Sequence, residues 1–247
     1  MQAIIMAAGR GTRLQTLNNT ISKHMLEITP GKPILSHTLD VLPEEIDEVI
    51  LVVNHLREHI QKFFGFSYGG RKIKYVVQEK LNGSGGAVWA TRKHLREQFL
   101  VISGDDIYHP KDIKKMVQCN SYCILVHNPP QEEAVKAAVI EINGDKTIKK
   151  IVEYPDSLKS KSRLINTGLY KLDKKIFKYP LQRKKPGDPE FGLPQTLVTL
   201  AKDIPIQVIE STFWQMVNTP EDFQQAKKVY PKLVKDLCKR NSKKFCR

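Results

Sequence analysis

Cysteine and long apolar runs are scarce in this sequence of 247 residues. Its four cysteines form no C-x-x-C pair and have no partnering histidines, which argues against a zinc site or a disulfide framework. This cysteine usage favours a reduced, cytoplasmic setting. No apolar run approaches the ~20 residues that a membrane-spanning helix needs. The first residues also lack the basic leader of a signal peptide, so we expect neither a membrane span nor export.

Two common phosphate-binding signatures are also missing from the start of the chain. Residues 3–8 form an apolar run that predicts a buried strand, and a loop with two glycines follows. A dinucleotide fingerprint requires a third glycine where Leu14 stands, and the P-loop pattern is absent. The loop instead carries Arg13, and Lys23 follows ten residues later. Glycine backbones can approach an anion closely, so the pattern predicts a phosphate cradle at the end of a strand.

The positive charge is concentrated at the end of the chain. Between Lys227 and Arg247 nine basic residues stand against Asp236 alone, whereas the net charge of the whole chain is +14. We therefore separate a domain over residues 1–230 from a basic tail over residues 231–247, which is helical or frayed. The tail is either a solvated helix face or a surface for an anionic partner. Nucleic acid is not an expected partner, and a homo-oligomer stays open.

Apolar runs and helical spacings alternate along the chain as in α/β proteins. The expected strands after the first are 48–54, 73–78, 99–103, 122–126, 137–142, 149–153, 164–170, 206–209 and 213–217, and the expected helices are 33–42, 56–64, a helix that opens at the turn 82–86, 193–202 and a helix from 219. Pro231 is expected to break or kink the last helix. This order predicts a doubly wound, mixed but mostly parallel sheet in a single domain.

The opening loop resembles a known enzyme signature. G-x-G-T-R-L, Lys23 and Lys32-Pro33-Ile34 are similar to the signature of the sugar-1-phosphate nucleotidyltransferases, and the spacing is closest to glucose-1-phosphate thymidylyl- and uridylyltransferases. A surface turn with incidental arginines is the alternative. The resemblance implies a Rossmann-like, GT-A-like fold and catalytic roles for Arg13 and Lys23. It also implies that the loop binds the nucleotide through Ala8, Gly9, Gly11, Thr12 and Arg13.

Carboxylates follow the strand at 99–103 in the tripeptide Gly104-Asp105-Asp106. Hard oxygen ligands at a strand end suit Mg²⁺, although a solvated turn is the alternative reading. The resemblance gives the metal and a catalytic role to Asp105 rather than Asp106. Met216 stands where many relatives carry a second carboxylate ligand, and a thioether does not suit Mg²⁺. We therefore expect Asn218, two residues on, to complete the metal site.

Two further groups of residues match the family pattern. Gln78, Gly83 and Ser84 match the segment that reads the base, and a glutamine can offer both a donor and an acceptor to uracil or thymine. The segments that bind the sugar phosphate match at Glu153, Asn166 and Gly168. The family's lysine after the glutamate is Tyr154 here, so one cation is missing unless Lys149, Lys150 or Lys161 replaces it.

These residues predict an Mg²⁺-dependent enzyme that joins an NTP, with UTP or dTTP favoured, to a sugar-1-phosphate and releases pyrophosphate. Two alternatives stay open. One is a CTP-dependent enzyme that uses phosphocholine or another phospho-alcohol. The other is a non-catalytic homologue that binds sugar nucleotides, because Tyr154 and Met216 depart from the family pattern.

Overall fold

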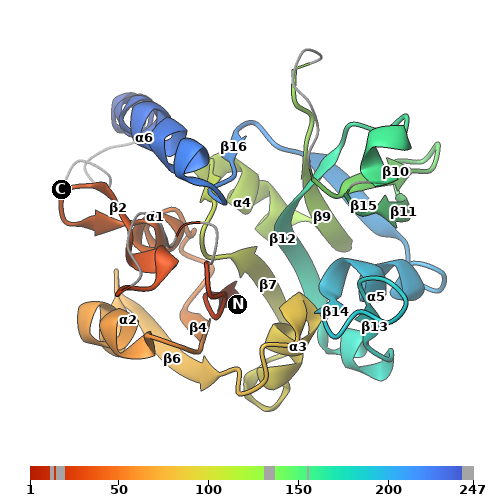
Figure 1. The fold of residues 1–247 in the computed structure, drawn as a ribbon, viewed down its shortest axis with the longest axis horizontal. Coiled ribbons are helices and arrows are strands. Elements are labelled where there is room, and N and C mark those ends of the chain that lie inside the picture. Colours follow the sequence, from red (N-terminus) through yellow and green to blue (C-terminus); the bar gives the residue numbers. More distant parts are fainter. Residues whose placement is uncertain (12–13, 15–19, 131–136, 155, 241–247) are drawn as a thin grey trace.

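The computed structural model describes residues 1–11, 14, 20–130, 137–154 and 156–240. A mixed sheet of ten strands runs through this part of the chain (Figure 1). Its main path is β11 (Ile148–Val152), β10 (Val139–Ile142), β12 (Ile165–Asp173), β7 (Gln98–Ser103), β1 (Gln2–Met6), β4 (Glu48–Val53), β6 (Arg71–Val77) and β5 (Ser67–Tyr68), while β9 (Tyr122–His127) pairs with β12 and with β15 (Ile206–Glu210). The predicted α/β class and mostly parallel sheet of a single domain are confirmed.

The strands from the first half of the chain are parallel. β1 lies between β4 and β7, and β4 pairs in turn with β6. β1, β4 and β7 are mainly apolar runs because both of their faces are covered by helices. The covering helices are α1 (Ile34–Asp40), α2 (Arg57–Phe64), α3 (Gly83–Ala90), α4 (Pro110–Gln118) and α5 (Leu193–Leu200). Sequence patterns indicated all of these helices except α4, which presents mainly Ile113 and Met116 to the core.

The second half of the chain adds an antiparallel region to the sheet. β12 pairs antiparallel with β7 on one side and with β9 and β10 on the other. β10 and β11 form a hairpin at Asn143, whose N–H donates to the carbonyl oxygen of Thr147 at 2.9 Å. β12 therefore joins the antiparallel region to the parallel region along β7.

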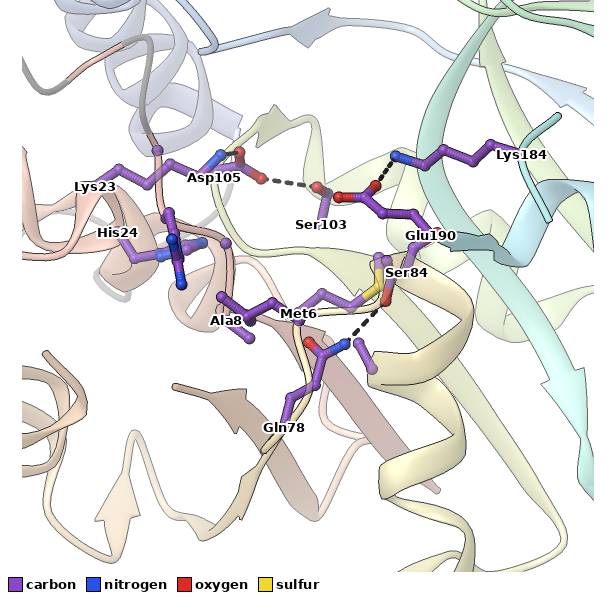
Figure 2. A pocket seen from close by; sticks show the side chains of 16 residues that line it. Met6, Ala8, Lys23, His24, Gln78, Ser84, Ser103, Asp105, Lys184 and Glu190 are labelled. Atoms are coloured by element: carbon purple, nitrogen blue, oxygen red, sulfur yellow. Dashed lines mark hydrogen bonds and ion pairs between the residues drawn. The ribbon is translucent and has the colours of Figure 1, made fainter. Parts of the chain in front are cut away.

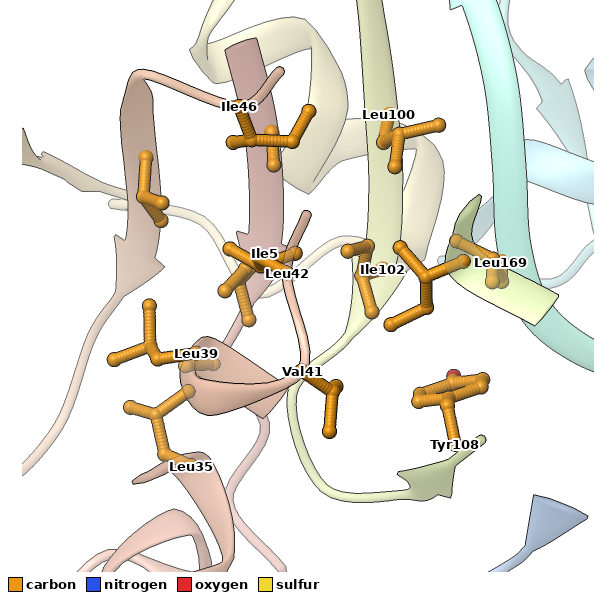
Figure 3. Close-up of a cluster of buried hydrophobic side chains, with 14 of the residues drawn as sticks. Ile5, Leu35, Leu39, Val41, Leu42, Ile46, Leu100, Ile102, Tyr108 and Leu169 are labelled. Atoms are coloured by element: carbon orange, nitrogen blue, oxygen red, sulfur yellow. The ribbon is translucent and has the colours of Figure 1, made fainter. Parts of the chain in front are cut away.

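Alternate residues of the parallel strands face two separate apolar layers. Ala3 and Ile5 of β1 pack in a cluster that includes residues of α1, α2 and α4, whereas Ile4 packs with residues of α3 and α5. Figure 3 shows part of the first layer, where Leu39 of α1 shares the cluster with Ile5 and Ile102. All of these side chains are fully or almost fully buried. Truncating one of them to alanine typically costs about 2–5 kcal/mol, so these layers hold the strands in register.

A third apolar cluster holds the last helix, α6 (Pro220–Arg240), near the hairpin of β2 (Glu27–Thr29) and β3 (Lys32–Pro33). α6 runs through Pro231 without ending, so the predicted break is wrong there, while the kink that was predicted as the alternative stays a prediction. The proline removes one backbone donor from the helix. Tyr230 and Leu233, on either side of it, are buried in the cluster, and this burial offsets the lost hydrogen bond. Among the described residues, no helix combines the length and the apolar character that crossing a membrane requires.

Candidate active site

The glycine-rich loop and the acidic turn meet at one edge of the sheet. β1 and β7 are parallel neighbours, and Met6 pairs with Ser103 at the carboxyl ends of these strands. The N–H of Gly104 donates to the carbonyl oxygen of Met6 at 3.0 Å. The sheet therefore places the loop that follows β1 directly beside the turn that carries Asp105, as the sequence predicted.

Lys23 and Asp105 form an ion pair on this edge. The ammonium of Lys23 contacts Oδ2 of Asp105, and the hydroxyl of Ser103 donates to Oδ1 at 2.8 Å. Gly11 has φ +62°, and a Cβ there would lie 2.8 Å from Cβ of Lys23. Only glycine fits this conformation and this approach without strain. Gly11 thus lets the loop close over the lysine that reaches Asp105.

The carboxylate of Asp105 is kept ionised by its neighbours. Burial raises the pKa of this group, but the charge of Lys23 and the hydrogen bonds from Lys23 and Ser103 act in the opposite direction. The net result lowers the pKa of Asp105 to about 2. A buried carboxylate that is ionised and already paired with a cation is a suitable ligand for a hard divalent cation.

Asp106 faces a different part of the molecule. Its two oxygens accept hydrogen bonds from the indole Nε1 of Trp214 and from the N–H of Val217, both at 3.2 Å. Burial and the charge of Asp105 raise the pKa of Asp106 well above its ordinary value. Asp106 therefore anchors the segment that precedes α6, whereas Asp105 is the carboxylate that pairs with Lys23.

The proposed second metal ligand, Asn218, follows this anchored segment. Its N–H donates to Oδ2 of Asp222 at 2.9 Å, which fixes its backbone at the start of α6. The carboxamide of Asn218 is not among the described groups that line the cleft, and its role as a ligand stays a prediction. Within the described residues, no cluster of three or more acidic, histidine or cysteine side chains is arranged for a metal.

The predicted base-reading residues form the opposite side. Gln78 is buried, and its Nε2 donates to the carbonyl oxygen of Gly83 at 3.0 Å and to Oδ1 of Asn82 at 3.1 Å. Gly83 has φ +91°, and a Cβ there would lie 2.4 Å from the carbonyl oxygen of Phe191. Ser84 accepts a hydrogen bond from the N–H of Leu193 at 3.0 Å. Side-chain and backbone contacts therefore fix this group before any ligand binds.

A cleft of about 730 Å³ joins the two sides (Figure 2). It is lined by Met6, Ala8, Gly9, Arg10, Gly11, Lys23, His24, Gln78, Leu81, Gly83, Ser84, Ala87, Ser103, Asp105, Lys184 and Glu190. The structure thus brings together the predicted residues of the loop, Lys23, Asp105 and the base-reading group. Thr12 and Arg13, which the sequence also predicted here, lie outside the described residues.

Sequence reasoning did not single out His24, Lys184 or Glu190. His24 is buried, and burial lowers its pKa to about 4, so its ring is neutral at pH 7. Lys184 and Glu190 form an ion pair on the hairpin of β13 (Gln182–Arg183) and β14 (Phe191–Gly192). The hairpin strands are two residues long and carry no apolar period, so no sequence signal places this hairpin at the cleft.

The predicted sugar-binding residues lie together in the antiparallel region. Oδ1 of Asn166 accepts a hydrogen bond from the N–H of Gly168 at 3.1 Å, and Nε2 of Gln195 donates to Glu153 at 2.5 Å. Gly168 lies against Ser103, which itself lines the cleft. Glu153, Asn166 and Gly168 are not among the described residues that line the cleft, Gly168 lies against its lining residue Ser103, and their binding role stays a prediction.

The three lysines that were suggested to replace the missing lysine at position 154 are not among the described residues that line the active-site cleft. Lys149 and Lys161 border a separate groove of about 690 Å³ together with Arg163. That groove lies at the end of the β10–β11 hairpin that carries Glu141 and Ile142. Tyr154 itself is 49% exposed.

Comparison with known proteins agrees with the fold. The profile of the family described as "Nucleotidyl transferase" matches residues 2–232. The chain therefore belongs to the nucleotidyl transferase family, which confirms both the family predicted from its motifs and its assignment as an enzyme.

Curated relatives are about a third identical to this chain over the residues that align. The bifunctional protein GlmU of Methanocaldococcus jannaschii is 32% identical over 229 residues, which cover 92% of this chain and 54% of that protein. The chain spans about half the length of the GlmU proteins that it matches. The UTP–glucose-1-phosphate uridylyltransferase AglF of Haloferax volcanii is 29% identical over 234 residues, covering 92% of this chain and 95% of that protein.

Solved structures share the fold. A UDP-glucose pyrophosphorylase complexed with UDP-glucose superposes with a TM-score of 0.79 and 23% identity, covering 94% of this chain and 98% of that chain. A putative glucose-1-phosphate thymidylyltransferase from Bacillus anthracis also reaches a TM-score of 0.79, with 22% identity, and covers 99% of this chain and 98% of its own.

Proposed function

We propose that this chain transfers a nucleotidyl group from an NTP to a sugar-1-phosphate, with UTP or dTTP as the favoured donor and Mg²⁺ as the cofactor. The observation that carries the proposal is the pairing of Lys23 with Asp105 beneath a glycine-rich loop, opposite Gln78 in the same cleft. One end of the cleft offers groups for phosphates and the other offers an amide for a base. A domain that only binds sugar nucleotides would not require this charged pair.

The chemistry requires alignment more than proton transfer. The second pKa of a phosphate monoester is near ~6, so the acceptor's phosphate oxygen is largely ionised at pH 7 and needs no general base. This oxygen attacks the α-phosphorus of the NTP, a bond forms between them, and the bond from the α-phosphorus to the bridging oxygen of the β-phosphate breaks. Pyrophosphate leaves with the electron pair of that bond. The protein must bring two polyanions together and compensate their charge.

We assign this work to the predicted site residues. Lys23 binds the α-phosphate or the incoming sugar phosphate, and loop N–H groups of residues 9–12 together with Arg13 bind the leaving pyrophosphate. Asp105 and Asn218 would hold Mg²⁺. When bound, the metal neutralises phosphate charge at the reacting centre. The fit of the metal rests on Asp105, whose low pKa keeps it anionic and which already binds a cation, Lys23.

Gln78 supports a pyrimidine base. Its Nε2 is held by Gly83 and Asn82, which fixes the plane of the amide. The amide oxygen is the acceptor that the N3–H of uracil or thymine requires. The printed name of the AglF relative specifies UTP and glucose 1-phosphate, which makes this pair the first substrates to test. A relative from Campylobacter jejuni, 30% identical, is named as a guanylyltransferase, so GTP is tested alongside.

The experiment is a pyrophosphate-release assay of the purified chain. Each of UTP, dTTP, CTP and GTP is paired with glucose 1-phosphate, other sugar-1-phosphates and phosphocholine. We expect release with UTP or dTTP and a sugar-1-phosphate, and its loss on chelation with EDTA and recovery with added Mg²⁺. Turnover with CTP and phosphocholine alone would establish the cytidylyltransferase alternative. No release of pyrophosphate with any pair would overturn the proposal in favour of a binding protein.

A further inference from the structure

The sugar-phosphate side of the site lacks a cation at the position where the family pattern places one. That position is Tyr154, which is half exposed. Lys149 and Lys161 border another groove. Lys184 lines the active-site cleft together with Asp105 and Ser103. The structure therefore supplies a cation to the cleft from an element that the sequence did not indicate.

The hairpin that carries Lys184 is tied to the nucleotide side of the cleft. The N–H of Phe191 donates to the carbonyl oxygen of Asn82 at 2.7 Å, immediately before Gly83. Across the hairpin, the N–H of Lys184 donates to the carbonyl oxygen of Glu190 at 3.1 Å. Backbone contacts at both places fix where the two side chains start, and the side chains themselves are 40% and 42% exposed.

The charges of Lys184 and Glu190 are suited to binding a phosphate group. Figure 2 shows Glu190 and Lys184 paired at the cleft, and Cβ of Glu190 lies 3.1 Å from the position that a Cβ on Gly83 would take. A lone carboxylate in a cleft for two polyanions would repel them, and the ammonium of Lys184 compensates the charge of Glu190. The ammonium has three donors and can bind a phosphate oxygen in addition to, or in place of, the carboxylate.

We propose that Lys184 binds the phosphate of the acceptor substrate and thereby replaces the lysine absent at position 154, with Glu190 positioning its ammonium. This inference rests on the proposed function, because it assigns the sugar-phosphate subsite of the same cleft. It predicts that Lys184 contributes to binding of the sugar-1-phosphate and not to binding of the NTP.

The first experiment compares Lys184→Met with Lys185→Met. Lys185 is the exposed neighbour on the same hairpin and does not line the cleft, so it is the matched control. We expect Lys184→Met to raise the KM for glucose 1-phosphate at least ~10-fold, as for loss of a hydrogen bond to a charged group, while the KM for UTP changes less than about 2-fold. Lys185→Met should match the wild type. Equal thermal midpoints for all three proteins would show that folding is unaffected.

A second comparison separates phosphate binding from simple charge compensation. In the double variant Lys184→Met with Glu190→Gln, the repelling carboxylate is gone. If Lys184 binds the acceptor, the double variant keeps the raised KM for glucose 1-phosphate. If Lys184 only neutralises Glu190, the double variant recovers the wild-type KM, and the inference is overturned. Glu190→Gln alone should bind the acceptor as well as the wild type or better.

Calorimetric titration with glucose 1-phosphate gives a reading that does not depend on turnover. Weaker binding to Lys184→Met than to wild type would support the inference even if no NTP is turned over. An active wild type with an unchanged Lys184→Met variant would overturn this inference and leave the proposed function standing. A wild type that neither binds glucose 1-phosphate nor releases pyrophosphate would overturn both.

Discussion

The parallel and antiparallel regions of the sheet differ in how closely they follow the family pattern. The parallel region, built on β1, β4, β6 and β7, carries the glycine-rich loop, Lys23, Gln78 and Asp105. The antiparallel region around β9–β12 carries the sugar segments. Both departures from the family motifs, Tyr154 and Met216, come after the parallel strands in the chain. The family motifs are thus retained along the parallel region, and they are altered at one proposed sugar-phosphate position, Tyr154, and at one proposed metal position, Met216.

The strongest test of this comparison is Lys23→Ala against Lys149→Ala. Lys23 provides a preorganised charge in the cleft, and loss of such a contact typically costs ~3–4 kcal/mol, or 10²–10³ in rate. We expect turnover to fall at least about 100-fold for Lys23→Ala and for Arg13→Ala, with the fold retained. Lys149 borders the separate groove, so Lys149→Ala should stay near wild type. Near-normal turnover of purified Lys23→Ala would refute the assignment of the reacting centre to the parallel region.

A second test uses the acid sensitivity of His37 in the parallel region. Burial lowers the pKa of His37 to about 4, while Nε2 lies 3.1 Å from the carbonyl oxygen of Tyr108. An unfolded histidine has a pKa near ~6.5, so the unfolded chain binds more protons below that pH. The contribution of neutral His37 is therefore complete above about pH 6.5 and decreases as the pH falls toward 4, by up to about 3 kcal/mol.

His37→Gln keeps a donor for the Tyr108 carbonyl but does not titrate in this range. We expect its free energy of unfolding, measured with urea at pH 7.5 and at pH 5, to fall less with acid than that of the wild type. The same loss with acid in both proteins would show that His37 is not the group responsible.

The third test addresses Gly83, which joins the base-reading group to the β14 hairpin. Gly83→Ala would place a Cβ 2.4 Å from a backbone oxygen at a φ of +91°. We expect a loss of about 1–3 kcal/mol of stability, because a strained backbone has to shift the hairpin or Asn82. Gly144→Ala in the antiparallel region is the control, since nothing lies within 4 Å of its Cβ position. Equal thermal midpoints for the two variants would contradict the close contact.

The smallest expected effect is that of Gln78→Met. The variant keeps the length of the side chain but loses the amide, so hydrogen bonds worth about 0.5–1.5 kcal/mol each disappear. We expect kcat/KM for UTP to fall about 10-fold and the preference among the four NTPs to weaken. Lys80→Met, at an exposed position two residues on, should change neither value. An unaltered NTP preference in Gln78→Met would move base recognition to other residues.

The sequence identified the parallel region well because physical signals there are local. A buried parallel strand needs a continuous apolar run, and β1, β4 and β7 each have one. The loops after these strands must meet at one edge, so Lys23 and Asp105 could be expected together before their contact was seen. Glycine at position 83 likewise marked the turn that opens α3.

Other features depend on contacts that no local pattern reveals. α4 was missed because its buried face consists mainly of Ile113 and Met116 among lysines. The helix break at Pro231 was wrong because burial of Tyr230 and Leu233 outweighs the preference of proline. Lys184 enters the cleft through a hairpin that is positioned by Phe191, more than one hundred residues after the Asn82 that it contacts.

The anchoring of Trp214 and Val217 by Asp106 has a consequence for the order of folding. The donors lie 108 and 111 residues after the acceptor. During synthesis the turn that carries Asp106 leaves the ribosome long before Trp214 does. The carboxyl group of Asp106 therefore has to remain hydrated until the segment with Trp214 and Val217 has been made. Docking of that segment is thus a long-range closure with a slow entropic search. A chain truncated ahead of Trp214 should accumulate as an open, aggregation-prone intermediate.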